Sequence, residues 1–327
     1  MTGAPREAGS LSPSKGPGPR ASIVIPSRGG AARLPHLFDA LRAQTTGDWE
    51  AIVVLDGDID SSAAVVEAVR DELPVRSIVF SENRGRSAAL NAGFEVATGD
   101  VLIRCDDDLR PRPDYVAAHI ARHASAEVGV VGLVQNVFPE TPYARAYGNI
   151  RDARFRDEAY ALSPDRRWRQ WCGNVSVTRA TYDLVGPYDP DFRTYGWEDV
   201  DWGYRLASAG IDVVFAPELE TPHHIAAVTT EIRVKRAFYS GAARRTFVAK
   251  HGESALGRRA AGAGPWGRLI DRTGLRLGLA DLLARARRAD AALDRMPRWL
   301  AEKRVSWLVE SAALSGELHP EQVTTDV

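Results

Sequence analysis

Short apolar runs alternate with amphipathic segments along most of the chain. Runs rich in Val, Ile and Leu predict buried strands at residues 22–25, 51–55, 75–80, 101–105 and 128–134. Between these runs, apolar residues recur at helical spacing; Leu34, Phe38 and Leu41, for example, share one face of a predicted helix. Strands that alternate with helices in this way predict the α/β fold class, with a mostly parallel central sheet and helices on both of its faces.

A long irregular stretch interrupts this alternation. Residues 136–171 are rich in Arg, Tyr, Pro and Asp and show weak periodicity. We expect them to form a long connection over the functional edge of the sheet. Beyond them, strands are predicted at 172–177 and 212–216, and a helix at 180–185.

The two ends of the chain differ from its centre. Residues 1–20 contain Pro, Gly, Ser and scattered charges without an apolar centre, which predicts a disordered tail and not a signal peptide. Residues 226–327 predict a C-terminal helical extension, so we expect the α/β domain to span residues 21–225. The extension is locally basic, with eleven Arg and one Lys against five acids over residues 255–308. This pattern is typical of a solvated helical face; it also suits a peripheral contact with anionic lipid at the inner face of a membrane, or a homodimer interface.

Composition narrows the class of protein. The chain has 327 residues, of which 44% are hydrophobic and 26% charged, and it can bury a substantial core. Its net charge of −1 gives no reason to expect nucleic acid as a partner. Cys105 and Cys172 match no disulfide or metal-binding spacing, and no apolar run approaches the roughly 20 residues that cross a bilayer. A cytoplasmic protein is the simplest expectation.

Three consecutive carboxylates, Asp106, Asp107 and Asp108, end the predicted strand at residues 101–105. The carboxyl ends of strands in α/β sheets are where ligands bind. Adjacent acids repel one another unless a cation or a set of donors neutralises them, and alternation lets Asp106 and Asp108 face the same way. A divalent ion with a phosphorylated ligand fits this pattern. An Asp-rich turn before a helix N-cap near Asp114 fits it equally well.

Six segments, in this order, resemble those of the inverting family 2 glycosyltransferases, which have the GT-A fold. They are Val24-Ile25-Pro26, the strand end at Asp56, Asn83-Arg84-Gly85 through Asn91-Ala92-Gly93, Asp106-Asp107-Asp108, Gly173-Asn174, and Trp197-Glu198-Asp199. The resemblance covers about residues 22–250. It implies an enzyme that moves a sugar from a nucleotide-diphosphate sugar to the hydroxyl of an acceptor, either a small molecule or a lipid-linked sugar.

The resemblance also implies which residues bind the donor and a metal ion. Asp106 and Asp108 would hold Mn²⁺ or Mg²⁺, because a divalent ion bridging both phosphates stabilises the leaving group. His223 or His224 matches the third metal ligand, although a polar loop without a ligand role explains this pair too. The implied donor-binding residues are Pro26, Ser27, Arg28, Asp56, Asn83, Arg86, Asp106 and Asp107.

Two of these donor assignments leave alternatives open. The stretch Leu55-Asp56-Gly57-Asp58 departs from the pair of acids that the family carries there, so the acid that meets the nucleotide base is undetermined. Arg84 or Arg86 can face the diphosphate, and either can equally be a surface residue. The sequence therefore predicts a nucleoside pocket without the identity of the nucleotide.

The second half of the chain is expected to supply a base and an acceptor site. Asp199 matches the family's catalytic base, which takes the proton of the attacking hydroxyl, and Glu198 matches the neighbour that orients the site. Acids at a helix start also complement the helix dipole, which is the structural alternative. The implied acceptor-binding residues are Gly173, Asn174, Trp197, Glu198 and Trp202.

Two other classes of protein share this kind of sheet. A nucleotidyltransferase, which makes a nucleotide sugar from a nucleoside triphosphate and a sugar phosphate, usually has a basic, Gly-rich loop after its first strand, and residues 27–33 faintly resemble one. A non-catalytic carbohydrate-binding relative would lack the metal or base carboxylates, and all of them are present. The glycosyltransferase interpretation is therefore preferred to both.

Overall fold

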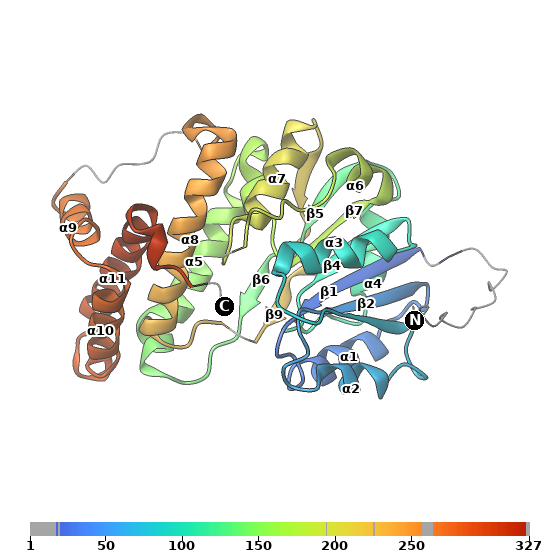
Figure 1. Ribbon diagram of the computed structural model, residues 1–327, viewed down its shortest axis with the longest axis horizontal. Coiled ribbons are helices and arrows are strands. Elements are labelled where there is room, and N and C mark those ends of the chain that lie inside the picture. The colour runs from blue at the N-terminus through green and yellow to red at the C-terminus, as the bar shows by residue number, and fades with distance from the viewer. Residues whose placement is uncertain (1–17, 19, 194, 225, 257–263, 325–327) are drawn as a thin grey trace, which may run out of the picture.

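A seven-stranded sheet forms the centre of the molecule, in the order β3-β2-β1-β4-β7-β5-β8 (Figure 1). The computed structural model describes residues 18, 20–193, 195–224, 226–256 and 264–324. Neighbouring strands are parallel except β7, which runs antiparallel to β4 and β5, so the predicted mostly parallel sheet is confirmed. The strands are β1 Ala21–Ser27, β2 Trp49–Leu55, β3 Val75–Val79, β4 Val101–Cys105, β5 Val128–Val131, β7 Asn174–Thr178 and β8 Asp212–Phe215.

Helices cover both faces of this sheet, as the sequence predicts. Side chains alternate along a buried strand, so Ile23 and Ile25 join the core on one face while Val24 joins the core on the other. Helices α1, α2 and α4 supply the first core, and α3, α6 and α7 supply the second. Their bounds are α1 Leu34–Arg42, α2 Ser62–Glu67, α4 Tyr115–Arg122, α3 Arg86–Val96, α6 Arg179–Val185 and α7 Glu198–Ser208.

The stretch from residue 136 to 171 is more regular than the sequence suggests. It contains a full helix, α5 (Asn149–Tyr160), preceded by η1 (Ala144–Gly148) and followed by η2 (Pro164–Gln170). The expected irregular connection is therefore wrong, because α5 buries only Asp152 and Ala159 and leaves no apolar stripe to detect. Before it, β6 (Val134–Asn136) pairs with β9 (Thr221–His223) in a small separate sheet.

The predicted C-terminal helical part is confirmed, and it consists of several helices. Helices α8 and α11 cross closely at two glycines. A Cβ added to Gly241 or Gly316 would lie about 2.0 Å or less from a backbone oxygen of the other helix. The core that these helices share includes Tyr143 and Tyr147. These two tyrosines, at η1, join the C-terminal helices to the stretch of residues 136–171. The elements are α8 Thr230–His251, η4 Glu253–Leu256, α9 Pro265–Gly274, α10 Leu279–Asp290, η5 Leu293–Arg295, α11 Arg298–Leu318 and η6 Pro320–Gln322, with η3 Pro217–Leu219 before them.

Two expectations about the ends of the domains stay open. The predicted tail at residues 1–20 lies almost wholly outside the described residues, and the boundary at residue 225 stays a prediction. Within the described part of the chain, every helix is too short or too polar to pass through a bilayer.

Candidate active site

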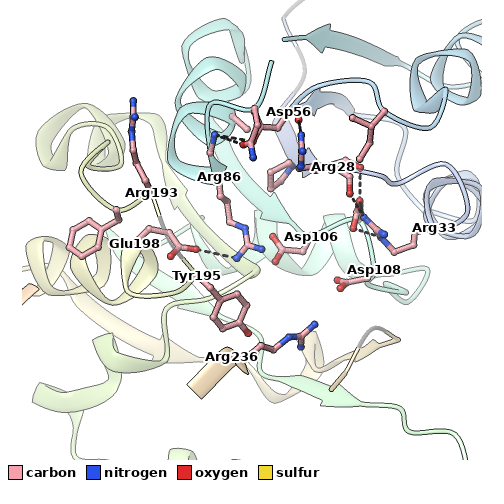
Figure 2. Close-up of a pocket in the computed structure, with 18 residues that line it drawn as sticks. Arg28, Arg33, Asp56, Arg86, Asp106, Asp108, Arg193, Tyr195, Glu198 and Arg236 are labelled. Atoms are coloured by element: carbon pink, nitrogen blue, oxygen red, sulfur yellow. Dashed lines mark hydrogen bonds and ion pairs between the residues drawn. The ribbon is translucent and has the colours of Figure 1, made fainter. Parts of the chain in front are cut away.

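A cleft of about 410 Å³ opens at the carboxyl ends of β1, β2 and β4, where the starts of α3 and α7 meet them (Figure 2). Carboxyl ends of neighbouring strands converge there because the strands are parallel. Every residue predicted to bind the donor lines this cleft. They are Pro26, Ser27, Arg28, Asp56, Asn83, Arg86, Asp106 and Asp107. The structure therefore brings the donor-binding set together, and the role of each residue stays a proposal.

Asp56 shapes the end of the cleft at the carboxyl end of β2. Its carboxylate accepts hydrogen bonds from the backbone N–H groups of Arg84, at 2.6 Å, and Gly85, at 2.9 Å. Its carbonyl oxygen accepts one from Nη1 of Arg28 at 2.7 Å. Gly85 has φ +89°, a conformation that favours glycine, and it lets the loop before α3 fold back onto the carboxylate. Asp56 therefore fixes the loop that carries Asn83 into the cleft.

The three adjacent aspartates separate into different environments. Asp107 is 6% exposed, and its carboxylate accepts hydrogen bonds from the Ser27 hydroxyl at 2.5 Å and from Nη2 of Arg33 at 2.7 Å. Burial raises the pKa of Asp107, and the Arg33 guanidinium opposes this shift. Asp107 thus ties β4 to the loop after β1. It lines the cleft, but both of its carboxylate oxygens already accept hydrogen bonds.

Asp106 and the predicted base meet on one buried arginine. Arg104 of β4 has a side chain that is 1% exposed, and its Nε donates to Oδ1 of Asp106 at 3.0 Å. Nη1 of the same guanidinium pairs with Oδ1 of Asp199. Gly173 lies against Asp106, where an added Cβ would be 2.4 Å from a carboxylate oxygen. Both carboxylates therefore lie within the reach of one guanidinium, although Asp106 and Asp199 come from distant parts of the sequence.

The start of α7 places two acids beside the cleft through an unusual backbone conformation. Trp197 has φ +74°, which is rare for a residue with a side chain, and it follows Gly196 at φ +86°. Glu198 lines the cleft, and its Oε1 accepts a hydrogen bond from Nη1 of Arg86 at 3.1 Å (Figure 2). Oε2 of Glu198 is buried without a partner in the described part of the chain. This turn therefore fixes the direction in which α7 presents its first residues.

Asp199 keeps some contact with solvent, since 17% of its side chain is exposed. Burial raises the pKa of Asp199 to about 7; Arg104 lowers it, and the neighbouring charge of Glu198 raises it. Among the described contacts, Arg104 binds only Oδ1 of Asp199 and leaves Oδ2 available. A carboxyl group with a pKa near neutrality and an accessible oxygen suits a general base.

Asp108 and His223 form a pair that suits a cation. Nε2 of His223 lies 3.0 Å from Oδ2 of Asp108, and Nδ1 lies 2.6 Å from Oδ1 of Asn136. The amide nitrogen of Asn136 donates to Asp152, so its Oδ1 accepts, and Nδ1 of His223 carries the proton. In the neutral imidazole, Nε2 then directs a lone pair at a carboxylate, an arrangement that calls for a proton or a metal ion between them.

The remaining oxygen of Asp108 supports the same interpretation, because Oδ1 is buried with no hydrogen-bond partner among the described residues. In the part of the chain that the structure describes, no three His, Cys, Asp or Glu side chains gather around one point. Asp108 and His223 are therefore the residues that could hold a metal ion here. Asp106 is held by Arg104, and the exposed His224 donates only its backbone N–H to Asp108, so the predicted ligand roles of these two residues stay predictions.

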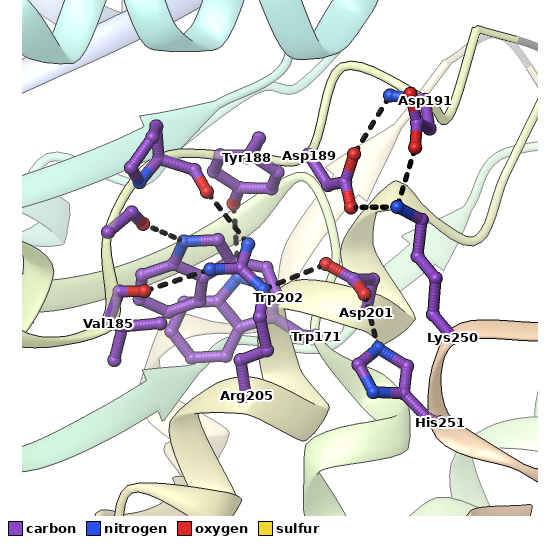
Figure 3. A network of polar contacts seen from close by, with 12 residues as sticks. Trp171, Val185, Tyr188, Asp189, Asp191, Asp201, Trp202, Arg205, Lys250 and His251 are labelled. Atoms are coloured by element: carbon purple, nitrogen blue, oxygen red, sulfur yellow. Dashed lines mark hydrogen bonds and ion pairs between the residues drawn. The ribbon is translucent and has the colours of Figure 1, made fainter.

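Two residues predicted to bind the acceptor are structural instead. Trp202 is 1% exposed; its indole N–H donates to the carbonyl of Gly186 at 2.9 Å, and its ring stacks on Trp171 (Figure 3). Asn174 is fully buried, and its amide donates to the carbonyl of Leu219 at 2.8 Å. The predicted acceptor contacts of both are wrong, because the periodicity of the sequence does not show which polar and aromatic side chains point into the core.

Trp197 and a group of charged residues anchor α7. The Trp197 indole donates to Ser240 of α8 at 3.0 Å, so this residue also serves packing, and it does not line the cleft. Asp201 is 1% exposed and accepts from Nε of Arg205 at 2.9 Å, while Nε2 of His251 lies 2.6 Å from its other oxygen (Figure 3). These contacts hold the acid-bearing start of α7 against α8.

Several residues of the cleft were missed by the sequence interpretation. Arg236 of α8 lies over the ring of Tyr195 at 5.6 Å, and both line the cleft (Figure 2). Arg193 lines it as well, and Arg33 does so through its pair with Asp107. These arginines and Tyr195 lie outside recognisable motifs, so only the fold brings them to the site.

Comparisons with known proteins show the family and the fold of this chain. The sequence profile described as Glycosyl transferase family 2 matches residues 22–183. Validoxylamine A glucosyltransferase of Streptomyces hygroscopicus subsp. jinggangensis is 30% identical over 239 residues, which are 63% of this chain and 56% of that protein. Undecaprenyl-phosphate 4-deoxy-4-formamido-L-arabinose transferase of Pseudomonas fluorescens is 31% identical over 223 residues, which are 66% of this chain and 57% of that protein.

A solved structure shares the architecture. Mannosyltransferase PcManGT from Pyrobaculum calidifontis, in complex with GDP-Man and Mn²⁺, superimposes with a TM-score of 0.61 at 18% identity, over 95% of this chain and 90% of that one. The sheet, its helices and the helical C-terminal part thus define a GT-A type fold. The chain belongs to glycosyl transferase family 2. It spans 52% to 57% of the length of the first three curated relatives that it matches.

Proposed function

We propose that this protein is a metal-dependent, inverting glycosyltransferase that moves a sugar from a nucleotide-diphosphate sugar to an acceptor hydroxyl. The observation that carries the proposal is the convergence of acids from distant parts of the sequence at one edge of the sheet, where Asp56, Asp106, Asp108 and Glu198 line one cleft and Asp199 pairs with the arginine that holds Asp106. Arg104 links Asp106 to Asp199, and the Asp108–His223 pair, at 3.0 Å, completes the same edge of the sheet. Membership of family 2 supports the class of reaction.

The donor would lie along the cleft from Asp56 towards Glu198. Pro26, Ser27 and Asp56 form the nucleoside end, and Arg28 and Arg86 line the path to the acids. Guanidinium groups bind phosphate oxygens through several N–H donors, so these arginines suit the diphosphate. PcManGT, which shares this fold, is in complex with GDP-Man and Mn²⁺, and this supports a nucleotide sugar as the donor.

A divalent ion would be held by Asp108 and His223, with Mn²⁺ favoured over Mg²⁺ by the imidazole. When bound, such an ion stabilises the negative charge that develops on a leaving nucleoside diphosphate. Asn136 fixes the orientation of His223 from behind. Asp106 and Asp107, both held by arginines, would shape the pocket around the ion.

The base would be Asp199. In a single displacement, the acceptor oxygen forms a bond to the sugar carbon while the bond from that carbon to the phosphate oxygen breaks, which inverts the configuration. The hydroxyl loses its proton to Oδ2 of Asp199, the oxygen that Arg104 does not bind. Glu198, held by Arg86, is placed to accept a hydrogen bond from another acceptor hydroxyl.

Activity should depend on pH through this base. Burial raises the pKa of Asp199 to about 7, and the base must be deprotonated to act. We therefore expect kcat/KM to rise with pH through an inflection near 7 and to fall about tenfold for each unit below it. The measurement is kcat/KM for transfer between pH 5 and 9 at saturating metal. A profile that is flat from pH 5 to 8 would contradict the assignment.

The donor assignment can be tested before the acceptor is known. A panel of UDP-, GDP-, dTDP- and ADP-sugars is screened by thermal unfolding with Mn²⁺, with Mg²⁺ and with EDTA. Because a ligand that binds only the folded state raises the melting temperature by mass action, one class of nucleotide sugar should stabilise the protein, and EDTA should remove the effect. If no nucleotide sugar stabilises the protein with either metal, the donor site is misassigned.

The nucleotidyltransferase alternative finds no support in the comparisons or in the loop after β1. Arg33 is used in the pair with Asp107, and a Cβ added to Gly30 would lie 2.1 Å from the Ser27 hydroxyl. This loop is packed against the sheet and differs from an open phosphate-binding loop. Release of pyrophosphate from a nucleoside triphosphate and a sugar phosphate would favour the alternative.

The proposed partners include a hydroxyl-bearing acceptor, a small molecule or a lipid-linked sugar. A peripheral membrane contact through the C-terminal helices is supported by exposed Trp299 and Leu300, at 67% and 41%, next to Arg298. Leu269 and Leu275 of the same region are also exposed, at 43% and 62%. A homodimer through these helices, and a location at the inner face of the membrane, stay predictions from the sequence.

A further inference from the structure

An ion pair crosses the cleft between the two helices that begin there. Nη1 of Arg86 lies 3.1 Å from Oε1 of Glu198, although 112 positions separate the two residues in the sequence. Arg86 is the first residue of α3 and Glu198 is the first residue of α7, and both line the cleft. Figure 2 shows the guanidinium of Arg86 between Glu198 and Asp106. A donor that extends along the cleft from Asp56 therefore has to pass this cross-cleft ion pair.

The place of Arg86 in α3 is unfavourable for the helix itself. The N-terminal end of a helix carries a partial positive charge, which favours an acid or a bound anion there over an arginine. The N-cap residue, Gly85, has no side chain that could cap this end, and the first turn of α3 contains no acid. The start of α3 is therefore stabilised by negative charge in the cleft, which Glu198 provides in this structure.

Glu198 in turn depends on Arg86 for a counter-charge. The side chain of Glu198 is 3% exposed, and among the described residues Arg86 is the one cation that forms an ion pair with it. Oε2 of Glu198 has no hydrogen-bond partner in the same set of residues. A buried carboxylate that loses its partner is costly, so Glu198 binds Arg86 until another donor of hydrogen bonds replaces it.

The guanidinium of Arg86 can reach a second partner. Of its side chain, 44% is exposed, and a guanidinium has five N–H donors, of which one is used for Glu198. Burial lowers the pKa of Arg86, but the charges of nearby acids, chiefly Glu198 and Asp106, raise it overall. A diphosphate offers several charged oxygens, which guanidinium groups bind strongly. The phosphates of a donor and Glu198 would therefore compete for one cation.

We infer that the cross-cleft ion pair makes binding of the acceptor depend on the donor. Without a donor, Arg86 neutralises Glu198. The diphosphate of the donor takes the guanidinium of Arg86, and both oxygens of Glu198 are then left to accept hydrogen bonds from hydroxyls of the acceptor. Each ligand thereby favours the other, because coupling between two sites is reciprocal. The inference rests on the proposed glycosyl transfer and adds the order of binding, with the donor before the acceptor.

The test is a double-mutant cycle on nucleotide binding, which needs no acceptor. The probe is whichever of UDP, GDP, dTDP and ADP gives the largest thermal stabilisation with Mn²⁺. Its Kd is measured by calorimetry for the full-length wild type, Arg86→Gln, Glu198→Gln and the double variant. We expect Arg86→Gln to weaken binding about 10- to 100-fold, as for loss of a charged hydrogen-bonding group. Glu198→Gln should strengthen it about 3- to 10-fold, because Arg86 no longer has to leave a charged partner.

The Arg86→Gln background separates this competition from simple repulsion between Glu198 and the phosphates. If the two compete for Arg86, Glu198→Gln should change Kd by less than about twofold in that background. A gain there as large as in the wild type would mean that Glu198 acts on the phosphates without Arg86. Weaker or unchanged binding by Glu198→Gln alone would mean that Glu198 does not hold Arg86 back. Either result would overturn the inference.

Arg84→Gln is the matched control, because Arg84 lies on the same loop, its guanidinium covers the ring of Phe80 at 4.6 Å, and it does not line the cleft. It should bind the nucleotide as the wild type does, whereas a loss equal to that of Arg86→Gln would contradict the role of Arg86. Arg86→Lys should retain part of the affinity, and thermal unfolding without ligand checks each fold.

The same experiment distinguishes the two proposals from each other. If none of the four nucleoside diphosphates binds the wild type with Mn²⁺, the donor site itself is misassigned and the proposed function fails with it. If the nucleotide binds and Arg86→Gln weakens it, but Glu198→Gln brings no gain, the donor site stands and only the competition for Arg86 is refuted.

Discussion

Replacing Asp199 with Asn is expected to abolish sugar transfer while leaving donor binding nearly intact. The substitution keeps the size of the side chain and removes the oxygen that is proposed to act as the base. A positioned general base contributes about 10²- to 10⁴-fold, so kcat should fall by about that factor. The measurement combines initial rates of nucleoside diphosphate release with the melting temperature at saturating donor and Mn²⁺.

Two controls separate the base from its neighbours. Asp183→Asn changes a carboxylate on α6 whose side chain is 65% exposed, and it should leave both readouts unchanged. Glu198→Gln should raise KM for the acceptor more than it lowers kcat, because the proposed role of Glu198 is to hold an acceptor hydroxyl. Full activity of Asp199→Asn, or loss of activity in Glu198→Gln alone, would transfer the role of base away from Asp199.

Replacing Asp108 with Asn is expected to remove the metal-dependent part of donor binding. Oδ1 of Asp108 is buried without a partner among the described residues, and Oδ2 lies 3.0 Å from Nε2 of His223. The amide places a neutral oxygen or an N–H group in a space that suits a cation. The rise in melting temperature that Mn²⁺ adds to a nucleoside diphosphate should therefore disappear, and turnover should fall by at least about 10²-fold, as for the loss of several kcal/mol of charge stabilisation.

The adjacent histidines provide a matched pair for this prediction. His223→Ala should weaken Mn²⁺ in the same way as Asp108→Asn, with a smaller effect because one protein ligand remains. His224→Ala should change nothing, since the side chain is exposed and only its backbone N–H contacts Asp108. Equal effects of the two histidine variants, or normal metal dependence in Asp108→Asn, would contradict the proposed ligands.

The central sheet could be predicted because its strands are continuous apolar runs. Side chains such as Ile23 and Ile103 have to be buried, and a run that ends in carboxylates marks the carboxyl edge of a parallel sheet. Consequently, acids from Asp56 to Asp108 could be placed at one edge without knowledge of their neighbours. Their position at one edge of the sheet follows from strand direction alone.

The features that the sequence did not predict depend on contacts between distant residues. Arg104 lies inside an apolar strand, and its partner Asp199 is 95 residues away, so no local pattern connects them. The one available signal was a charged residue in a buried run, which calls for a partner. Trp202 shows the opposite case, in which the sequence predicts a contact that the fold does not allow. An aromatic ring close to acids predicts a surface on which a sugar can stack, but the ring of Trp202 is buried.

The most direct test of the account is a crystal structure with Mn²⁺ and the nucleoside diphosphate that gives the largest thermal stabilisation. Anomalous scattering locates the metal without reference to the protein coordinates. We predict one manganese peak between Asp108 and His223, with the diphosphate running from it past Arg28 or Arg86 and the nucleoside at Asp56. A nucleotide bound outside this cleft, or a manganese ion bound away from Asp108, would contradict the account.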